Sequence, residues 1–187
     1  YHMIPKELYY FISEYDESEI LTIKKKVNII YRNYKVPLNE DILKKVKRAC
    51  KKTGKKLFLS NNIKLALKLR LDGVYIPAFN KSRNLHLNLK RNTFKVLGSA
   101  HNLREIKIKE NQRVDTIFLA PIFKTVKSGN YLGINKFNLL SKLTDKKIVA
   151  LGGINENNIN NLKLLNCDGY AGITLFKNIK NNYDFKK

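Results

Sequence analysis

Short apolar runs alternate with helix-like segments along the whole chain, and this alternation is the feature that most restricts the fold. Eight runs have the length and the β-branched or aromatic content of buried strands. Near-continuous apolar strands of this kind are typical of a parallel sheet whose two faces are both covered. The predicted strands are residues 8–12, 27–32, 56–60, 73–76, 94–98, 114–119, 147–151 and 169–173.

Eight strand–helix units are the number that closes a (β/α)8 barrel, the TIM barrel. The chain has 187 residues, which is fewer than the roughly 200 that this fold usually needs. We therefore expect a compact α/β barrel with some shortened helices, the first and the fourth especially. An open doubly wound sheet is the alternative, but no Gly-x-Gly-x-x-Gly motif follows the first strand. Residues 4–187 are expected to form a single domain, with Tyr1 and His2 as non-native residues before an initiating Met3.

Capping residues predict where several helices begin and end. Asparagines are expected to cap the helices behind the fifth and seventh strands, because their side chains accept hydrogen bonds from free backbone amides. The predicted boundaries are Asp16 or Ser18 for the first helix, Pro37 and Gly54 for the start and end of the second, and Asn102 and Asn155 for the two later ones.

The net charge is extreme, since 37 Lys and Arg residues face 15 Asp and Glu residues, for a formal charge of +22. Such a field attracts polyanions. A nucleic-acid groove would gather these cations on one face with aromatic residues between them. Here Lys, Asn and Ile are over-used in every segment, which is typical of compositional drift. We therefore do not expect a nucleic-acid partner. The lack of a long apolar run argues against a membrane partner, and the strand ends described below indicate small phosphorylated substrates.

Cysteine usage and hydrophobic content narrow the class of protein further. Hydrophobic residues make up 43% of the chain, which argues against a disordered protein. No run approaches the ~18 apolar residues of a membrane span. Cys50 and Cys167 have no metal-binding spacing and are interpreted as free thiols of a cytoplasmic protein.

Small and hydroxyl residues end the four last predicted strands, where a barrel of this kind binds its ligand. Gly152 and Gly153 follow the seventh strand, and Ile173 and Thr174 end the eighth. Loops after these two strands often bind phosphate through backbone amides, and glycine lets an anion approach them closely. A tight turn without a ligand is the other interpretation of the two glycines.

Further polar residues follow the other strands and complete the candidate site. His101 could move a proton, and Thr125 could donate to a phosphate oxygen. Arg32 could meet a pyrophosphate or form an ion pair on the rim of the barrel. The remaining candidates are Ser99 after the fifth strand and Asn61, Asn62 and Asn80 after the third and fourth.

These motifs, taken in order, resemble the thiamine phosphate synthase and thiazole tautomerase family. The resemblance covers nearly the whole chain and is better from Asn61 onward. Its motifs are Asn-Asn-Ile at 61–63, Asp-Gly-Val-Tyr at 72–75, Ser-Ala-His at 99–101, Pro-Ile-Phe-x-Thr at 121–125, Leu-Gly-Gly-Ile at 151–154 and Gly-x-Ala-x-Ile-Thr at 169–174.

The resemblance implies a phosphate-binding barrel that joins a hydroxymethylpyrimidine pyrophosphate to a thiazole phosphate and releases pyrophosphate. In this family a Mg²⁺ ion holds the pyrophosphate. A second family activity isomerises a thiazole carboxylate phosphate with a histidine as acid and base, and His101 is similar in position. By position, the resemblance assigns Arg32, Asn61, Ser99 and Thr125 to the pyrimidine pyrophosphate, and Gly153, Ile173 and Thr174 to the thiazole phosphate.

The residues that would hold Mg²⁺ depart from the family pattern. The two family aspartates fall at Asn62 and Asn80, whose amides offer an oxygen but no charge, although Mg²⁺ is usually held through carboxylates. Lys127 or Lys35 could neutralise part of the pyrophosphate instead. Three functions stay open: a synthase-like transferase of thiamine biosynthesis with an impaired metal site, a metal-independent tautomerase-like enzyme that uses His101, and a phosphate-binding barrel without catalysis.

Overall fold

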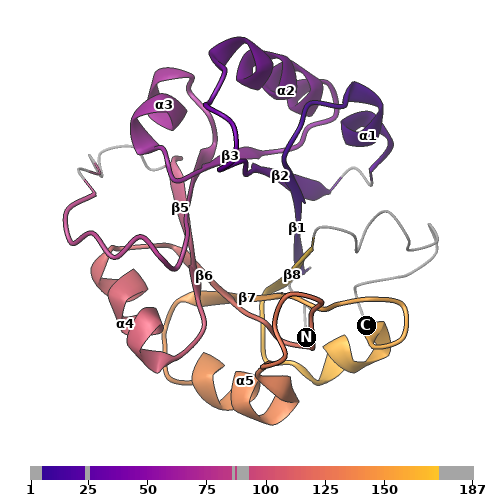
Figure 1. The fold of residues 1–187 in the computed structure, drawn as a ribbon, viewed down its shortest axis with the longest axis vertical. Coiled ribbons are helices and arrows are strands. Elements are labelled where there is room, and N and C mark those ends of the chain that lie inside the picture. The colour runs from indigo at the N-terminus through magenta and orange to yellow at the C-terminus, as the bar shows by residue number, and fades with distance from the viewer. Residues whose placement is uncertain (1–5, 24–25, 86, 88–92, 173–187) are drawn as a thin grey trace.

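Eight parallel strands pair in sequence order, and the last pairs back with the first to close a barrel (Figure 1). The computed structural model describes residues 6–23, 26–85, 87 and 93–172. The predicted (β/α)8 barrel is confirmed, and the open doubly wound sheet is excluded. The strands are β1 Glu7–Ile12, β2 Val27–Tyr31, β3 Leu57–Ser60, β4 Gly73–Ile76, β5 Lys95–Ala100, β6 Thr116–Leu119, β7 Lys147–Leu151 and β8 Gly169–Gly172.

Helices form a ring outside the strands, as Figure 1 shows in a view along the barrel axis. The first helix is short, as predicted, and the described residues between β4 and β5 hold no helix. Along its described residues, the loop after β4 therefore lacks the usual helical cover. The helices are α1 Glu17–Thr22, α2 Glu40–Lys52, α3 Ile63–Lys68, α4 Leu103–Asn111, α5 Gly133–Ser141 and the 3-10 helix η1 Ile159–Leu164.

The first two helices begin where a side-chain oxygen satisfies their free amides. Asp16 caps α1 by accepting a hydrogen bond of 3.2 Å from a first-turn amide, whereas Ser18 lies inside the helix. The prediction that Pro37 opens the second helix is wrong. Asn39 is the cap, because its Oδ1 accepts from two backbone amides at 2.9 and 3.3 Å. Gly54 follows the end of α2 with a φ of +65°, as a C-terminal glycine should.

The two later asparagines differ in what they cap. Asn102 caps α4, with its Oδ1 2.9 Å from the amide nitrogen of Glu105, as predicted. Asn155 does not cap η1, whose N-cap residue is Asn158. Its Oδ1 instead accepts from the amides of Asn157 and Asn158, so the side chain closes a turn after β7 before the helix begins.

Aromatic rings fill the interior of the barrel. The inward-facing side chains form a separate buried cluster, in which alternate positions of each strand point to the axis. The rings of Tyr9 and Phe118 meet edge to face with centroids 4.9 Å apart, and those of Phe11 and Tyr75 at 5.3 Å. The interior is therefore packed, and ligands can reach only its two mouths. The cluster contains Tyr9, Phe11, Ile30, Phe58, Tyr75, Leu97, Phe118, Val149 and Ala171.

A second and larger apolar layer lies between the strands and the surrounding helices. Both cysteines belong to it as free thiols. Burial raises the pKa of Cys50 to about 12 and that of Cys167 to about 11, so neither is a ready nucleophile at neutral pH. Within the described ranges, no helix has the length and apolar character that crossing a membrane requires.

Candidate functional site

A cavity of about 430 Å³ opens at the C-terminal mouth of the barrel, where β2, β4, β5, β6 and β7 end. The carboxyl ends of the strands are the face on which barrels of this kind bind their ligands. Apolar side chains form part of the wall, among them Ala120 and Leu151. The polar wall contains Arg32, Tyr34, Lys81, Ser99, His101 and Glu105.

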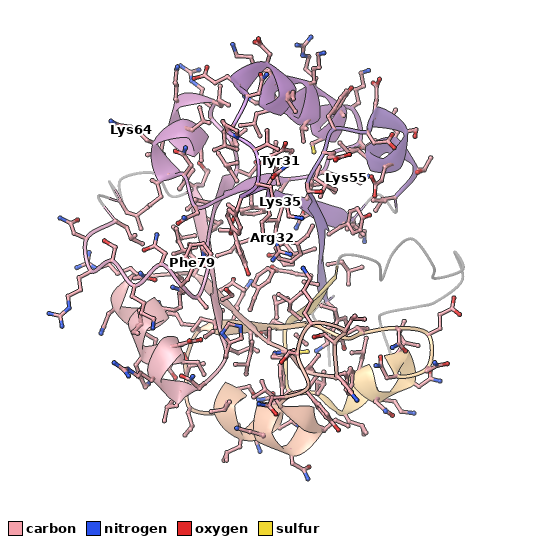
Figure 2. All side chains as sticks on the ribbon, viewed as in Figure 1. Tyr31, Arg32, Lys35, Lys55, Lys64 and Phe79 are labelled. Atoms are coloured by element: carbon pink, nitrogen blue, oxygen red, sulfur yellow. The ribbon has the colours of Figure 1, made fainter. Side chains whose placement is uncertain are left out.

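Arg32 is fixed over the centre of this mouth, as predicted from its place after β2 (Figure 2). Its guanidinium carbon lies 4.3 Å from the centroid of the Phe11 ring, and its charge acts on the hydroxyl of Tyr75. Burial raises the pKa of Tyr75 to about 12, while the neighbouring Ser99 and the charge of Arg32 act in the opposite direction. Tyr75 therefore stays neutral and leaves the charge of the arginine uncompensated.

Ser99 is buried and holds the loop that follows β4. Its Oγ accepts a hydrogen bond of 2.9 Å from the backbone amide of Ala78. Phe79, the next residue, packs edge to face against Tyr34 with ring centroids 5.4 Å apart, so two half-exposed aromatic rings flank the opening. The hydroxyl of Tyr34 is in turn hydrogen-bonded to Ser60 at the end of β3.

His101 also lines the cavity, and Glu105 holds it in place. The Oε2 atom of Glu105 lies 2.7 Å from Nδ1 of His101 and 2.7 Å from its backbone nitrogen. A carboxylate on one ring nitrogen leaves the other for a ligand or a proton. Glu105 is the only carboxylate among the residues that line this cavity in the described structure, and this pairing occupies it.

The three asparagines predicted for the pyrophosphate pocket lie beside the cavity without lining it. Asn62 caps α3, with its Oδ1 3.0 Å from the amide nitrogen of Leu65. Asn80 donates from Nδ2 to Oδ1 of Asn61 at 2.8 Å and accepts from the amide of Ser82 at 3.1 Å. The structure therefore brings Asn61 and Asn80 together, while Asn62 acts in its own helix.

These residues do not fit a Mg²⁺ site. In both Asn62 and Asn80 the single side-chain oxygen already accepts a backbone amide, and the other terminal atom is a nitrogen that can only donate. Mg²⁺ prefers charged oxygen ligands. Over the part of the chain that the structure describes, no three His, Cys, Asp or Glu side chains gather as a metal site would need.

A buried lysine that sequence reasoning missed stabilises the loop after β4. Lys109 is 1% exposed, and its Nζ donates to the carbonyl oxygen of Asn80 at 2.9 Å and to Oε1 of Gln112 at 2.7 Å. Gln112 itself donates to the carbonyls of Asn80 and Ser82 at 2.8 and 2.9 Å. Lys109 lies three residues after the buried Ile106, so helical spacing alone places it on the covered face of α4.

The two glycines after β7 form a turn that packs against the loop after β6. Their φ angles are +102° for Gly152 and +71° for Gly153. Phe123 donates from its amide to the carbonyl of Gly152 at 3.1 Å. A Cβ on Gly153 would lie 2.5 Å from the carbonyl oxygen of Lys124, so no other residue fits there. No hydrogen bond recorded among the described residues uses the amide of either glycine.

The remaining predicted residues are less close to the cavity. The Oγ1 atom of Thr125 accepts from the amide of Ser128 at 3.0 Å and thereby shapes the loop after β6. Lys127 and Lys35 are exposed and do not line the cavity. Ile173 and Thr174, predicted to complete the phosphate site, lie outside the described residues.

The opposite mouth of the barrel holds a second cavity, of about 300 Å³, at the strand starts. Some of its charged side chains are engaged within the protein. Lys147 lies 3.2 Å from Glu7, whose carboxylate also accepts from the hydroxyl of Tyr9 at 2.9 Å. Asp115 accepts from the backbone amide of Val96 at 2.8 Å. These contacts link neighbouring strand starts at this end of the barrel.

Residues 22–176 of the chain match the family described as "Thiamine monophosphate synthase". A "Thiamine-phosphate synthase" of Prochlorococcus marinus is 28% identical over 170 residues, which are 86% of this chain and 46% of that relative. A "Putative thiamine-phosphate synthase 2" of Aquifex aeolicus is 31% identical over 137 residues, which are 72% of this chain and 73% of the relative. The chain thus spans about half the length of the Prochlorococcus relative and most of the Aquifex one.

A solved structure shares the fold. The structure named "Thiamine phosphate pyrophosphorylase from Pyrococcus furiosus" superposes with a TM-score of 0.76 and covers 92% of this chain and 88% of its own. The two sequences are 19% identical in that superposition, so this likeness concerns the barrel itself.

Proposed function

Because the chain belongs to the thiamine monophosphate synthase family, we propose that it is a synthase-like transferase. It would join a hydroxymethylpyrimidine diphosphate to a thiazole phosphate and release pyrophosphate. The observation that carries the proposal is a C-terminal cavity lined by two cations, Arg32 and Lys81, neither of which forms an ion pair within the described residues. A diphosphate is the kind of group that such a cavity neutralises.

The proposed reaction is favoured by positive charge at the place where the pyrophosphate leaves. As the bond to the pyrimidine breaks, the leaving group takes the bonding electrons and its negative charge rises. A guanidinium that lies over the Phe11 ring is in place before this happens, so it stabilises the transition state without reorganising. Arg32 is therefore the residue assigned to the leaving group.

The second phosphate is assigned to the turn after β7. Gly152 and Gly153 adopt backbone conformations that L side chains rarely adopt, and their amides are not used by the hydrogen bonds of the described residues. Backbone amides of this kind bind phosphate readily. Thr125 lies in the loop that packs against this turn, and His101 lines the cavity, where it could take or give a proton. The roles of Ile173 and Thr174 in this cradle stay predictions.

The proposal is tested by a steady-state assay that follows pyrophosphate release from the two substrates. The wild-type protein should turn over only when both substrates are present. Arg32→Gln should lower kcat/KM by roughly 10²-fold, the cost of removing one pre-organised donor from a developing anion. A melting curve of the variant checks that the fold is kept. Absence of pyrophosphate release in wild type, with both substrates bound, would contradict the proposed reaction.

A further inference from the structure

We propose that this cavity neutralises the diphosphate with the side-chain cations Arg32 and Lys81 in place of a bound Mg²⁺. The inference rests on the proposed function only for the identity of the anion. It starts from Asn62 and Asn80, whose neutral side chains do not supply the charged oxygen ligands that Mg²⁺ prefers. Both amide oxygens serve backbone amides, and neither residue contributes charge.

Positive charge already occupies the place beside Asn80. The ammonium group of Lys109 lies 2.9 Å from the carbonyl oxygen of Asn80 and is enclosed by the protein. A divalent cation at this loop would face a like charge at short range in a poorly solvated region, where repulsion is strong. The one carboxylate in the described lining, Glu105, already faces His101 and the ammonium group of Lys109.

Lys81 is presented to the cavity by a loop whose backbone is fixed. Lys109 and Gln112 bind the carbonyls of Asn80 and Ser82, the residues on either side of Lys81. The side chain of Asn80 closes a turn over the same residues by accepting the amide of Ser82. The base of the Lys81 side chain is therefore set before a ligand arrives, which lowers the entropy lost on binding.

Arg32 and Lys81 reach the cavity from different strands. Arg32 follows β2, and Lys81 lies in the loop after β4, so the two cations come from separate parts of the rim. Two cations on separate supports can contact both phosphoryl groups of one diphosphate. Arginine supplies a planar set of donors and lysine a compact charge. Together they would supply positive charge to the diphosphate without any need for carboxylate ligands.

The test measures binding of inorganic pyrophosphate by calorimetry, in EDTA and in a few millimolar Mg²⁺. Wild type should bind pyrophosphate in EDTA, and Mg²⁺ should leave the affinity unchanged or weaken it, because Mg²⁺ removes the free anion. Lys81→Gln should weaken binding about tenfold or more, the usual effect of removing a charged hydrogen-bonding partner. Lys64→Gln is the matched control: it removes the same charge from the outer side of α3 (Figure 2) and should leave the affinity unchanged.

A rescue variant sharpens the test. Asn62→Asp with Asn80→Asp supplies two carboxylates, and aspartate caps a helix as well as asparagine does. In this variant Mg²⁺ should strengthen pyrophosphate binding, the reverse of wild type. The inference is overturned if wild type binds pyrophosphate only with Mg²⁺, if it does not bind it at all, or if Lys81→Gln binds like Lys64→Gln.

The failure of this inference differs from failure of the proposed function. Mg²⁺-dependent pyrophosphate binding together with turnover of both substrates would leave the synthase proposal and overturn the cation-only site. Metal-free binding that Lys81→Gln weakens, without turnover, would support the cation-only site and overturn the synthase.

Discussion

Lys109 brings a charged group into the interior, under the loop that follows β4. Burial lowers its pKa to about 8, and the like charge of Lys81 acts in the same direction, while Glu105 opposes it. Its hydrogen bonds to Asn80 and Gln112 hold the loop whether or not the amine is protonated, since the neutral amine still donates. The residue thus combines a structural role with sensitivity to pH.

The lowered pKa of Lys109 predicts how stability changes with pH. Between about pH 8 and the ordinary lysine value of 10.5, the unfolded chain binds more protons than the folded one, so this residue makes the protein more stable as pH rises. The raised pKa values of Cys50 and Cys167 act in the opposite direction above about pH 9.

Denaturant unfolding of wild type and Lys109→Met at pH 7.5 and pH 9.5 isolates the lysine, because the thiols contribute to both proteins. The stability of wild type relative to the variant should rise with pH. A constant difference would show that Lys109 titrates normally.

At the scale of single elements, the role of Asn62 in the structure is to cap the N-terminus of α3. Replacing it with alanine should cost about 1 kcal/mol of stability, the usual cost of losing a side-chain cap, since its Oδ1 accepts the amide of Leu65. Asn62→Asp should keep the stability within a few tenths of a kcal/mol. The free energy of unfolding in urea distinguishes the two. Equal loss in both variants would mean that the hydrogen bond to Leu65 contributes nothing.

Gly153, in the turn after β7, should tolerate alanine less well than two glycines elsewhere in the chain, Gly54 and Gly129. Gly153→Ala meets both an unfavourable φ of +71° and two carbonyl oxygens at 2.5 and 2.6 Å. We expect it to lose roughly 2–4 kcal/mol of stability and to lose pyrophosphate release with it. Gly54→Ala meets the unfavourable φ alone, because nothing lies within 4 Å of its added Cβ. It should lose about 1 kcal/mol.

Gly129→Ala serves as the control in this series, since it has open space and no positive φ to accommodate. Thermal melts of the three variants should rank Gly153→Ala below Gly54→Ala and both below Gly129→Ala. A Gly153→Ala protein as stable as the control would mean that the turn after β7 can rearrange, and the cradle assigned to it would lose its support.

For the molecule as a whole, a formal charge of +22 predicts a response to salt. The described ion pairs are few and lie at the surface, so most cations repel one another without a partner. Screening by salt relieves this repulsion. The melting temperature should therefore rise from 10 mM to 200 mM NaCl, with the same rise in KCl. A melting temperature that falls over this range would show that ion pairs outweigh the repulsion.

The sequence predicts the barrel better than it predicts the site. Strand order follows from the apolar runs and their spacing, because few folds accommodate parallel strands that are buried on both faces. Arg32, Ser99 and His101 are predicted from their places at strand ends, and the structure brings all three to one cavity.

Contacts formed between elements distant in sequence were not predictable. Lys81, Glu105 and Lys109 gain their roles from a loop and a helix that meet only in the folded chain. The same limit explains Asn62 and Asn80, which have the right positions for ligands but use their oxygens locally. The position of a residue along the chain therefore predicts whether it lies near the site. Its chemical role depends on the hydrogen-bond partners of its polar atoms, which the sequence does not show.

The aromatic rings along the barrel axis separate its two ends. Because Phe58, Tyr75 and Phe118 are buried and in contact with their neighbours, the described interior leaves no passage from one opening to the other. A ligand that enters beside Arg32 must therefore leave through the same opening. A ligand that a second one covers can leave only after the second one has gone.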